Sequence, residues 1–199
     1  ESKEDAVEAR VNLALQYLRK RDFEAARRNL KLALDIAPRN ADVHDAMAHT
    51  FSASGDLELA DKHYRMAVGY GGDTSRYRFN YANFLLRTGE FERAEKLLVE
   101  IADDSLYEKR GAALVLLGMT QQQLLKTDEA KRSFQRALVL DPNNIRVLRE
   151  LAILSYDDGE IPKSWEYFSQ YRQLVRQQQS QPTAAVSYTH LTLPTNKAV

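Results

Sequence analysis

The chain has 199 residues, and its 28 Lys and Arg residues balance 28 Asp and Glu residues, so the formal net charge is zero. This balance argues against a dedicated nucleic-acid-binding protein, because such proteins usually carry an excess of basic residues. The sequence contains no cysteine, which excludes disulfides, thiolate metal sites and thiol catalysis within these residues. No apolar stretch approaches the ~20 residues that a membrane-spanning helix needs.

Small residues recur along the chain at a period of about 34 residues. One row consists of Ala14, Ala48, Ala82, Gly118 and Ala152. A second row follows 12 residues later and consists of Ala26, Ala60, Ala94, Ala130 and Ser164. Self-similarity at this period predicts a repeat protein in which each repeat is one helical hairpin. Function is then expected on a surface and not in a catalytic pocket.

The predicted repeats, in chain order, are residues 7–40, 41–74, 75–108, 111–144 and 145–178. Apolar residues spaced three or four apart place one buried face on each of two successive helices in every repeat. Glycine marks the turn between the two helices in repeats 2, 3 and 5, at Gly55, Gly89 and Gly159. Proline ends the second helix in repeats 1 and 4, at Pro38 and Pro142. Repeats 1 and 4 lack the glycine, so their inner turns are less well specified.

The aligned Leu-Ala/Gly-x-x-Tyr, Ala-x-x-x-Phe and Pro positions resemble the tetratricopeptide repeat (TPR) over about 170 residues. This resemblance implies an all-α fold, a right-handed TPR superhelix (α-solenoid) of about five helix-turn-helix repeats. The small residues have a physical reason in such a fold. They let two helix backbones approach closely, and a neighbouring Tyr, Phe or Leu fills the adjoining space.

The C-terminal residues 179–199 do not continue the pattern. They are predicted to be a polar linker followed by a non-native or disordered tail, because residues 177–185 are polar and Gln-rich and residues 187–199 fit no repeat. A solenoid needs a polar capping element at each end. The sequence provides none after the fifth repeat, which suggests that the native array continues.

No constellation of residues predicts an active site, a cofactor or a bound metal. His44 and His49 are five residues apart and would point about 140° away from each other on a helix, which is poor metal-ligand geometry. Asp45 and His49 share a helix face and are interpreted as a solvated polar pair. Neither a glycine-rich phosphate loop nor a serine nucleophile elbow occurs. We therefore predict a protein that is not an enzyme.

The first helix of each repeat lines the concave face of a TPR superhelix, which predicts a partner-binding groove. The candidate groove residues are Leu15, Leu18, Phe79, Asn83, Leu86, Met119, Gln122, Arg149, Ile153 and Tyr156. Equivalent positions hold Val11, Asp45, His49, Ser52 and Val115. The groove is predicted to be largely apolar and to suit an amphipathic helix or an extended hydrophobic segment. It differs from co-chaperone TPR domains that hold a C-terminal carboxylate, because Asp45 would repel that group.

Several stretches are similar to the type IV pilus biogenesis and stability family of the PilF and PilW type. They are residues 10–18, 60–64, 79–85 and 105–110. The third resembles the family's Asn-Asn-Tyr-Gly-x-Phe-Leu, from which Phe79 and Ala82 depart. The fourth supplies a two-residue insertion before the fourth repeat, which a generic TPR protein need not have. The similarity covers about residues 7–178, and members have about six repeats, so this chain looks one repeat short.

The resemblance implies a periplasmic protein held to the outer membrane by a lipidated N-terminal cysteine that would lie upstream of Glu1. Its implied role, as a pilotin, is to assist assembly or localisation of the secretin channel and to stabilise pili. The implied partner is an outer-membrane secretin subunit or a pilus assembly protein, with no nucleic acid. The alternative is a generic TPR adaptor in another periplasmic or cytoplasmic complex, and the native N-terminus would distinguish the two.

Overall fold

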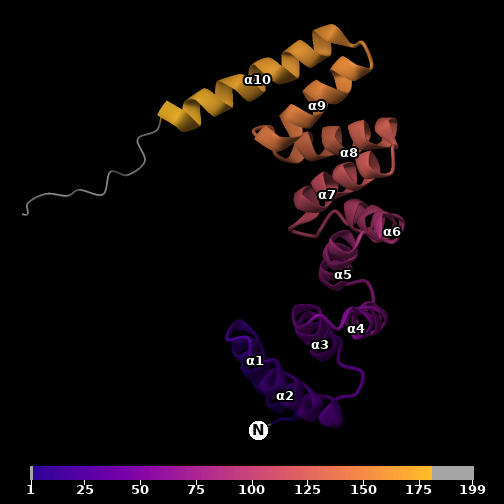
Figure 1. Ribbon diagram of the computed structural model, residues 1–199, viewed down its shortest axis with the longest axis vertical. Helices are drawn as coiled ribbons and strands as arrows, with labels where there is room; N and C mark the ends of the chain where they lie inside the picture. The colour runs from indigo at the N-terminus through magenta and orange to yellow at the C-terminus, as the bar shows by residue number, and fades with distance from the viewer. Residues whose placement is uncertain (1, 181–199) are drawn as a thin grey trace, which may run out of the picture. The chain divides into compact units, whose positions relative to one another are not determined.

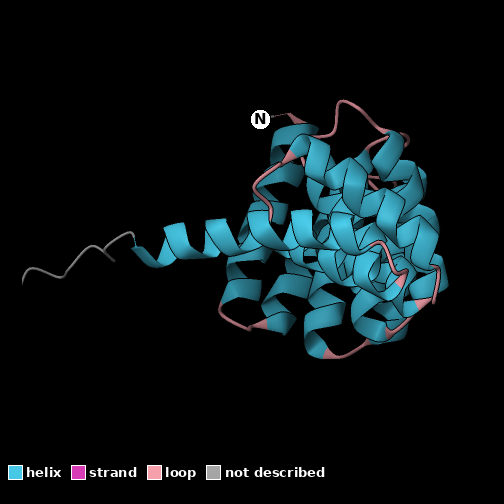
Figure 2. Ribbon diagram, turned by 90° about the horizontal axis from the view of Figure 1, so that it is seen from above, coloured by secondary structure: helices cyan, strands magenta, loops and turns pink. Residues whose placement is uncertain are grey.

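The computed structural model describes residues 2–180, and these residues form ten helices and no strand (Figure 1, Figure 2). The chain divides into two compact units, of which the first ends at Pro142 and the second begins at Asn143. The all-α architecture predicted from the repeat period is confirmed. Most of the predicted linker and tail, residues 181–199, lies outside the described residues.

The first compact unit consists of four helical hairpins. Their helices are α1 (Lys3–Arg19) and α2 (Phe23–Ile36), α3 (Ala41–Ser54) and α4 (Leu57–Tyr70), α5 (Ser75–Thr88) and α6 (Phe91–Asp103), and α7 (Arg110–Gln123) and α8 (Thr127–Leu140). Each helix packs on its hairpin partner, and α2, α4 and α6 also pack on the first helix of the next hairpin. The first helices also meet one another directly, because α1 contacts α3 and α3 contacts α5.

The second compact unit is a single hairpin. Its helices are α9 (Ile145–Asp157) and α10 (Ile161–Ser180). Helix α10 therefore runs two residues into the segment predicted as a linker. Phe168 on α10 is 41% exposed, whereas the residues at the same repeat position in the first unit are fully buried. Those residues are Leu30, Tyr64, Leu98 and Phe134.

In the first compact unit, the small residues of both rows are buried in the packing between helices. Ala26, Ala60, Ala94 and Ala130 of the second row are all completely buried. In the first row, Gly118 on α7 faces the ring of Phe134 on α8 so closely that an added Cβ would lie 2.7 Å from Cε1 of that ring. A Cβ atom fits there only if the Phe134 ring moves, which explains why glycine stands where the other repeats have alanine.

Side-chain hydrogen bonds join α3 to α5, and the two partners of each bond are about one repeat apart in the sequence. Tyr77 donates its hydroxyl to the Asp42 carboxylate at 3.0 Å, and Asn80 donates to Asp45 at 2.9 Å. Arg76 also binds Asp42. These partners are 34 or 35 residues apart in sequence, so successive first helices keep the repeat register through polar contacts.

The inner turn of every described hairpin contains a residue with left-handed backbone conformation. Gly55, Gly89 and Gly159 supply it with φ values of +91°, +81° and +74°. In repeats 1 and 4, where glycine is absent, Arg21 and Leu125 adopt φ values of +61° and +59°. A side chain with a Cβ atom is strained in this conformation, because Cβ approaches the following carbonyl oxygen.

We expect Leu125→Gly to raise the free energy of unfolding by about 0.5–1 kcal/mol, because it relieves that strain at a modest entropic cost. The Leu125 side chain is 89% exposed, so its removal uncovers little apolar surface. Leu125→Ala is the matched control, since it shortens the side chain but keeps the strained Cβ. Urea denaturation would measure both variants, and a glycine variant no more stable than the alanine variant would contradict the prediction.

Candidate partner-binding groove

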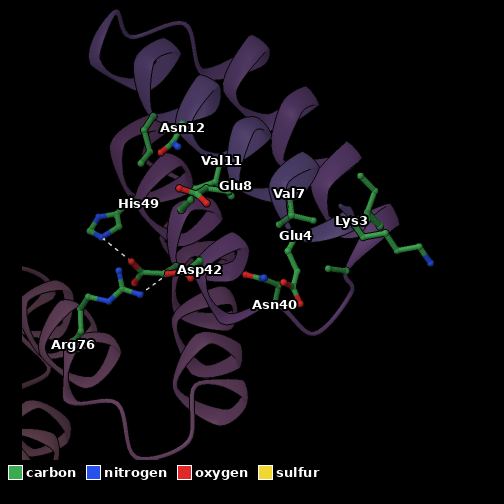
Figure 3. Close-up of a pocket in the computed structure, with 15 residues that line it drawn as sticks. Lys3, Glu4, Val7, Glu8, Val11, Asn12, Asn40, Asp42, His49 and Arg76 are labelled. Atoms are coloured by element: carbon green, nitrogen blue, oxygen red, sulfur yellow. Dashed lines mark hydrogen bonds and ion pairs between the residues drawn. The ribbon is translucent and has the colours of Figure 1, made fainter. Parts of the chain in front are cut away.

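Two neighbouring cavities open along the first helices of the first compact unit. The acidic cavity, of about 500 Å³, is lined by residues 3–15 of α1, by the N-terminal half of α3 and by Arg76 of α5 (Figure 3). The arginine cavity, of about 580 Å³, is lined by residues at the C-terminal ends of α1, α3 and α5 and at the inner turns that follow α1 and α3. His49 lines both cavities. We call the two together the α1–α3–α5 groove.

The acidic cavity carries an excess of negative charge. Its charged lining consists of Glu4, Glu8, Asp42 and Asp45 against Lys3 and Arg76. Arg76 binds Asp42, and Figure 3 shows this pair at the edge of the cavity. Glu4 and Glu8 make no ion pair with any residue of the 2–180 segment. Val7, Val11 and Leu15 supply the apolar wall beside these carboxylates.

Asp45 is held in place by groups on three helices. Asn80 of α5 donates to its carboxylate at 2.9 Å, and His49 Nε2 on α3 lies 3.6 Å from it. The hydroxyl of Tyr64 on α4 lies 3.1 Å from His49 Nδ1. When this hydroxyl donates to Nδ1, a neutral His49 ring carries its proton on Nε2, the nitrogen beside Asp45. Burial raises the pKa of the Asp45 carboxyl, and the contacts with His49 and Asn80 partly oppose this. A cation entering the cavity would stabilise the ionised carboxylate further.

The arginine cavity has the opposite charge. Its lining includes Arg21 and Arg87 and no acidic residue. The Arg21 guanidinium lies 5.7 Å from the centre of the Phe23 ring, and Arg87 donates to the Ser52 hydroxyl at 3.0 Å. Among the described residues, neither arginine pairs with a carboxylate. Leu18 provides apolar surface within this cavity.

The structure brings some of the predicted groove residues together. Leu15 and Leu18 are half-buried on successive turns of α1, one in each cavity. Phe79 on α5 is half-buried, and its ring lies 5.9 Å from that of Tyr107. Asn83 donates its amide to the Phe79 carbonyl at 2.8 Å, so that donor serves its own helix. The remaining first-unit candidates are Leu86 and Gln122, both half-buried, and Met119, which is 36% exposed.

Three predicted groove residues belong to the second compact unit. Ile153 and Tyr156 are 48% and 66% exposed on α9. Arg149, also exposed, pairs with Glu150 at 2.6 Å. A groove that runs through all five repeats therefore stays a prediction.

Apart from Asp45, the charged lining of the groove was missed by the sequence prediction of a largely apolar surface. Glu8, Asp42 and Arg76 occupy the second position of repeats 1, 2 and 3. This position lies about one helical turn before Val11 and the equivalent groove positions of the other repeats. Continuing the three- and four-residue spacing of the groove residues toward the N-terminus of each helix would have included it. Glu4 precedes the predicted start of the first repeat, because α1 begins at Lys3.

Other kinds of site were sought in the same residues. In the segment from 2 to 180, no group of three or more His, Asp or Glu side chains is arranged to hold a metal ion. Among the described helices, none combines the length and the apolar character needed to cross a bilayer.

Comparison with known proteins identifies the repeat. Tetratricopeptide-repeat family models match residues 7–40, 46–105 and 111–144. The chain is 33% identical over 171 residues to the type IV pilus assembly protein PilF of Pseudomonas aeruginosa, covering 86% of this chain and 68% of PilF. The solved structure of that PilF superposes with a TM-score of 0.73 at 32% identity, over 87% of this chain and 78% of the PilF chain.

A more distant structure has the same fold. The type IV pilus biogenesis factor PilW superposes with a TM-score of 0.67 at 21% identity, over 85% of this chain and 78% of PilW. At that identity the likeness concerns the fold alone. The repeat matches and the identity to PilF over two thirds of its length show that the chain belongs to the PilF family of tetratricopeptide-repeat proteins.

Proposed function

We propose that this chain is a non-enzymatic scaffold that assists type IV pilus biogenesis by binding a segment of an outer-membrane secretin subunit or another pilus assembly protein. Membership of the PilF family supports the pilus assignment. The α1–α3–α5 groove carries the binding assignment, because it offers two open cavities on adjacent first helices. On this proposal the protein acts as a pilotin lipoprotein at the periplasmic side of the outer membrane.

The surface of the first helices has the composition of a protein-binding site. Leu15, Leu18 and Phe79 are half-buried, so each presents apolar surface that a partner can cover without unfolding the hairpin beneath it. Charged and polar groups of the two cavities lie beside Leu15 and Leu18, whereas Phe79 lines neither cavity. An apolar centre with a polar rim is the usual anatomy of a protein–protein interface.

Phe79→Glu combined with Met119→Glu is expected to abolish binding of the secretin subunit, because each change places a charge on apolar surface that the partner would cover. The matched control is Val99→Glu combined with Val139→Glu, which adds the same two charges to exposed valines on the second helices α6 and α8. Pull-down of purified secretin subunit would measure binding, and circular dichroism would verify helicity. Neither residue lines the two cavities, so undiminished pull-down by the first double variant would contradict a binding surface that continues from the α1–α3–α5 groove onto Phe79 of α5 and Met119 of α7.

A further inference from the structure

Opposite charges line the two ends of the α1–α3–α5 groove. Glu4 and Glu8 face the acidic cavity, and Arg21 and Arg87 face the arginine cavity. None of these four side chains makes an ion pair with another described residue. Within the described residues no ion pair neutralises these charges; Arg87 donates to the Ser52 hydroxyl and Arg21 lies over the Phe23 ring, and both keep their charge toward the cavity.

The two cavities adjoin at His49, and the length that they cover together can be measured along α3. Asp42 and Ala53 are 11 residues apart on α3 and line the acidic and the arginine cavity respectively. At 1.5 Å per residue of helix, this separation is about 16 Å. An extended chain advances ~3.3 Å per residue, so about five residues of a bound strand-like segment would span it.

Helix dipoles account for only part of this charge pattern. Acidic residues favour the first turn of a helix and basic residues the last, and the effect fades within one turn. Glu8 and Asp45 lie beyond the first turn of α1 and α3, yet both line the acidic cavity. Arg21 lies in the turn after α1 and still faces the arginine cavity. The side of the helix that these residues share is the groove side.

We propose that the groove binds a protein segment of dipolar charge in one orientation. A Lys or Arg of the partner sits near Glu4 and Glu8, and an apolar stretch lies against Val11, Leu15 and Leu18. An Asp or Glu of the partner, about five residues further along an extended segment, sits near Arg21 and Arg87. This inference rests on the proposed scaffold function and adds the chemistry of the segment that is recognised.

Charge complementarity of this kind determines orientation and specificity more than total affinity. A segment bound the wrong way round would place its carboxylate beside Glu8 and its cation beside Arg87, and both contacts would be repulsive. Because the groove is open to solvent, binding should weaken as ionic strength rises above about 0.1 M, where the Debye length falls below about 10 Å.

Random 12-residue peptides displayed on phage provide a defined probe for this orientation. Selection against the intact chain is expected to enrich peptides with a basic residue and an acidic residue about five positions apart, flanking apolar residues. Glu8→Lys should weaken such a peptide about tenfold, which corresponds to ~1.4 kcal/mol. The double swap Glu8→Lys with Arg87→Glu should enrich a different set of peptides. Glu58→Lys with Arg28→Glu is the matched control, because these exposed residues line neither cavity.

The absence of cysteine allows a direct test of direction. Asn12→Cys introduces a thiol in the acidic cavity and Ala53→Cys one in the arginine cavity, both at exposed positions. A selected peptide whose cysteine, placed beside its basic residue, is activated as a mixed disulfide with thionitrobenzoate should form a disulfide with the first variant at least about tenfold faster than with the second. The protein thiolate attacks the peptide sulfur and thionitrobenzoate leaves, and this exchange requires direct contact. Equal rates, or the reverse preference, would overturn the inference.

The outcomes separate this inference from the function on which it rests. Enriched peptides that ignore the charge swap overturn the dipolar groove and leave secretin binding untouched. Failure to enrich any peptide overturns the dipolar groove and removes the support that the cavities give to the scaffold function. If the peptides behave as expected but purified secretin subunit does not bind, only the proposal that the partner is a secretin subunit is contradicted.

Discussion

Gly118→Ala is expected to lower the free energy of unfolding by about 1–3 kcal/mol, the usual range for overpacking a filled core. The added methyl group would lie 2.7 Å from the Phe134 ring, which is completely buried and would have to move within a packed core. The higher helix propensity of alanine offsets up to about 1 kcal/mol of the cost. Thermal and urea denaturation of the intact chain would measure the loss.

A second substitution, Phe134→Leu, is expected to recover part of the unfolding free energy that Gly118→Ala removes. Phe134→Leu in the Gly118→Ala chain recreates the Ala82 and Leu98 combination that the third repeat holds at the same two positions. Phe134→Leu alone should destabilise by leaving a cavity, so the two changes together are expected to cost less than their sum. Strict additivity would show that Gly118 and Phe134 do not determine each other's size.

Acidification is expected to destabilise the fold through a buried pair of histidines. His44 Nε2 lies 3.0 Å from the Pro38 carbonyl and must donate to it, so His44 Nδ1 accepts a hydrogen bond from His63 Nδ1 at 2.9 Å. Burial is the main cause that lowers the pKa of His63 to about 4, and the nearby His44 and Lys62 contribute to the same shift. The unfolded chain then takes up this proton at a higher pH than the folded chain does.

The stability contributed by neutral His63 is therefore complete above pH 6.5 and is lost as the pH falls toward 4. Solvent screens the half-buried ring, so we expect a loss of about 1–2 kcal/mol over this range. His63→Gln removes the titrating ring, and its free energy of unfolding should vary less between pH 7 and pH 4 than that of the unaltered chain. Identical pH profiles from urea denaturation would contradict the assignment to His63.

The fold was predictable because its signal is repeated. The 34-residue spacing of Ala14, Ala48 and Ala82 indicates helical hairpins whose backbones approach closely, and the structure confirms the helical architecture. One local strain was not predictable. The sequence shows that repeats 1 and 4 lack glycine at the inner turn, but only the backbone shows that Arg21 and Leu125 adopt the left-handed conformation.

The candidate site was predictable only in part. Helical spacing indicates that Leu15 and Leu18 share the groove side of α1, and both line cavities there. The charges of Glu8 and Arg87 were missed, because an exposed charged residue on a helix reads as a solvated side chain unless its neighbours are known. Their meaning depends on which adjacent helix they face, and that is a tertiary property.

The hydrogen bonds between α3 and α5 have a mechanical consequence. Tyr77, Asn80 and Arg87 act as cross-braces between consecutive first helices, with contacts to Asp42, Asp45 and Ser52. A motion that separates α3 from α5 must lengthen these hydrogen bonds. Apolar contacts in the hairpins are not directional and tolerate small displacements better. We therefore expect the spacing between α3 and α5, on this wall of the groove, to change little when a partner binds.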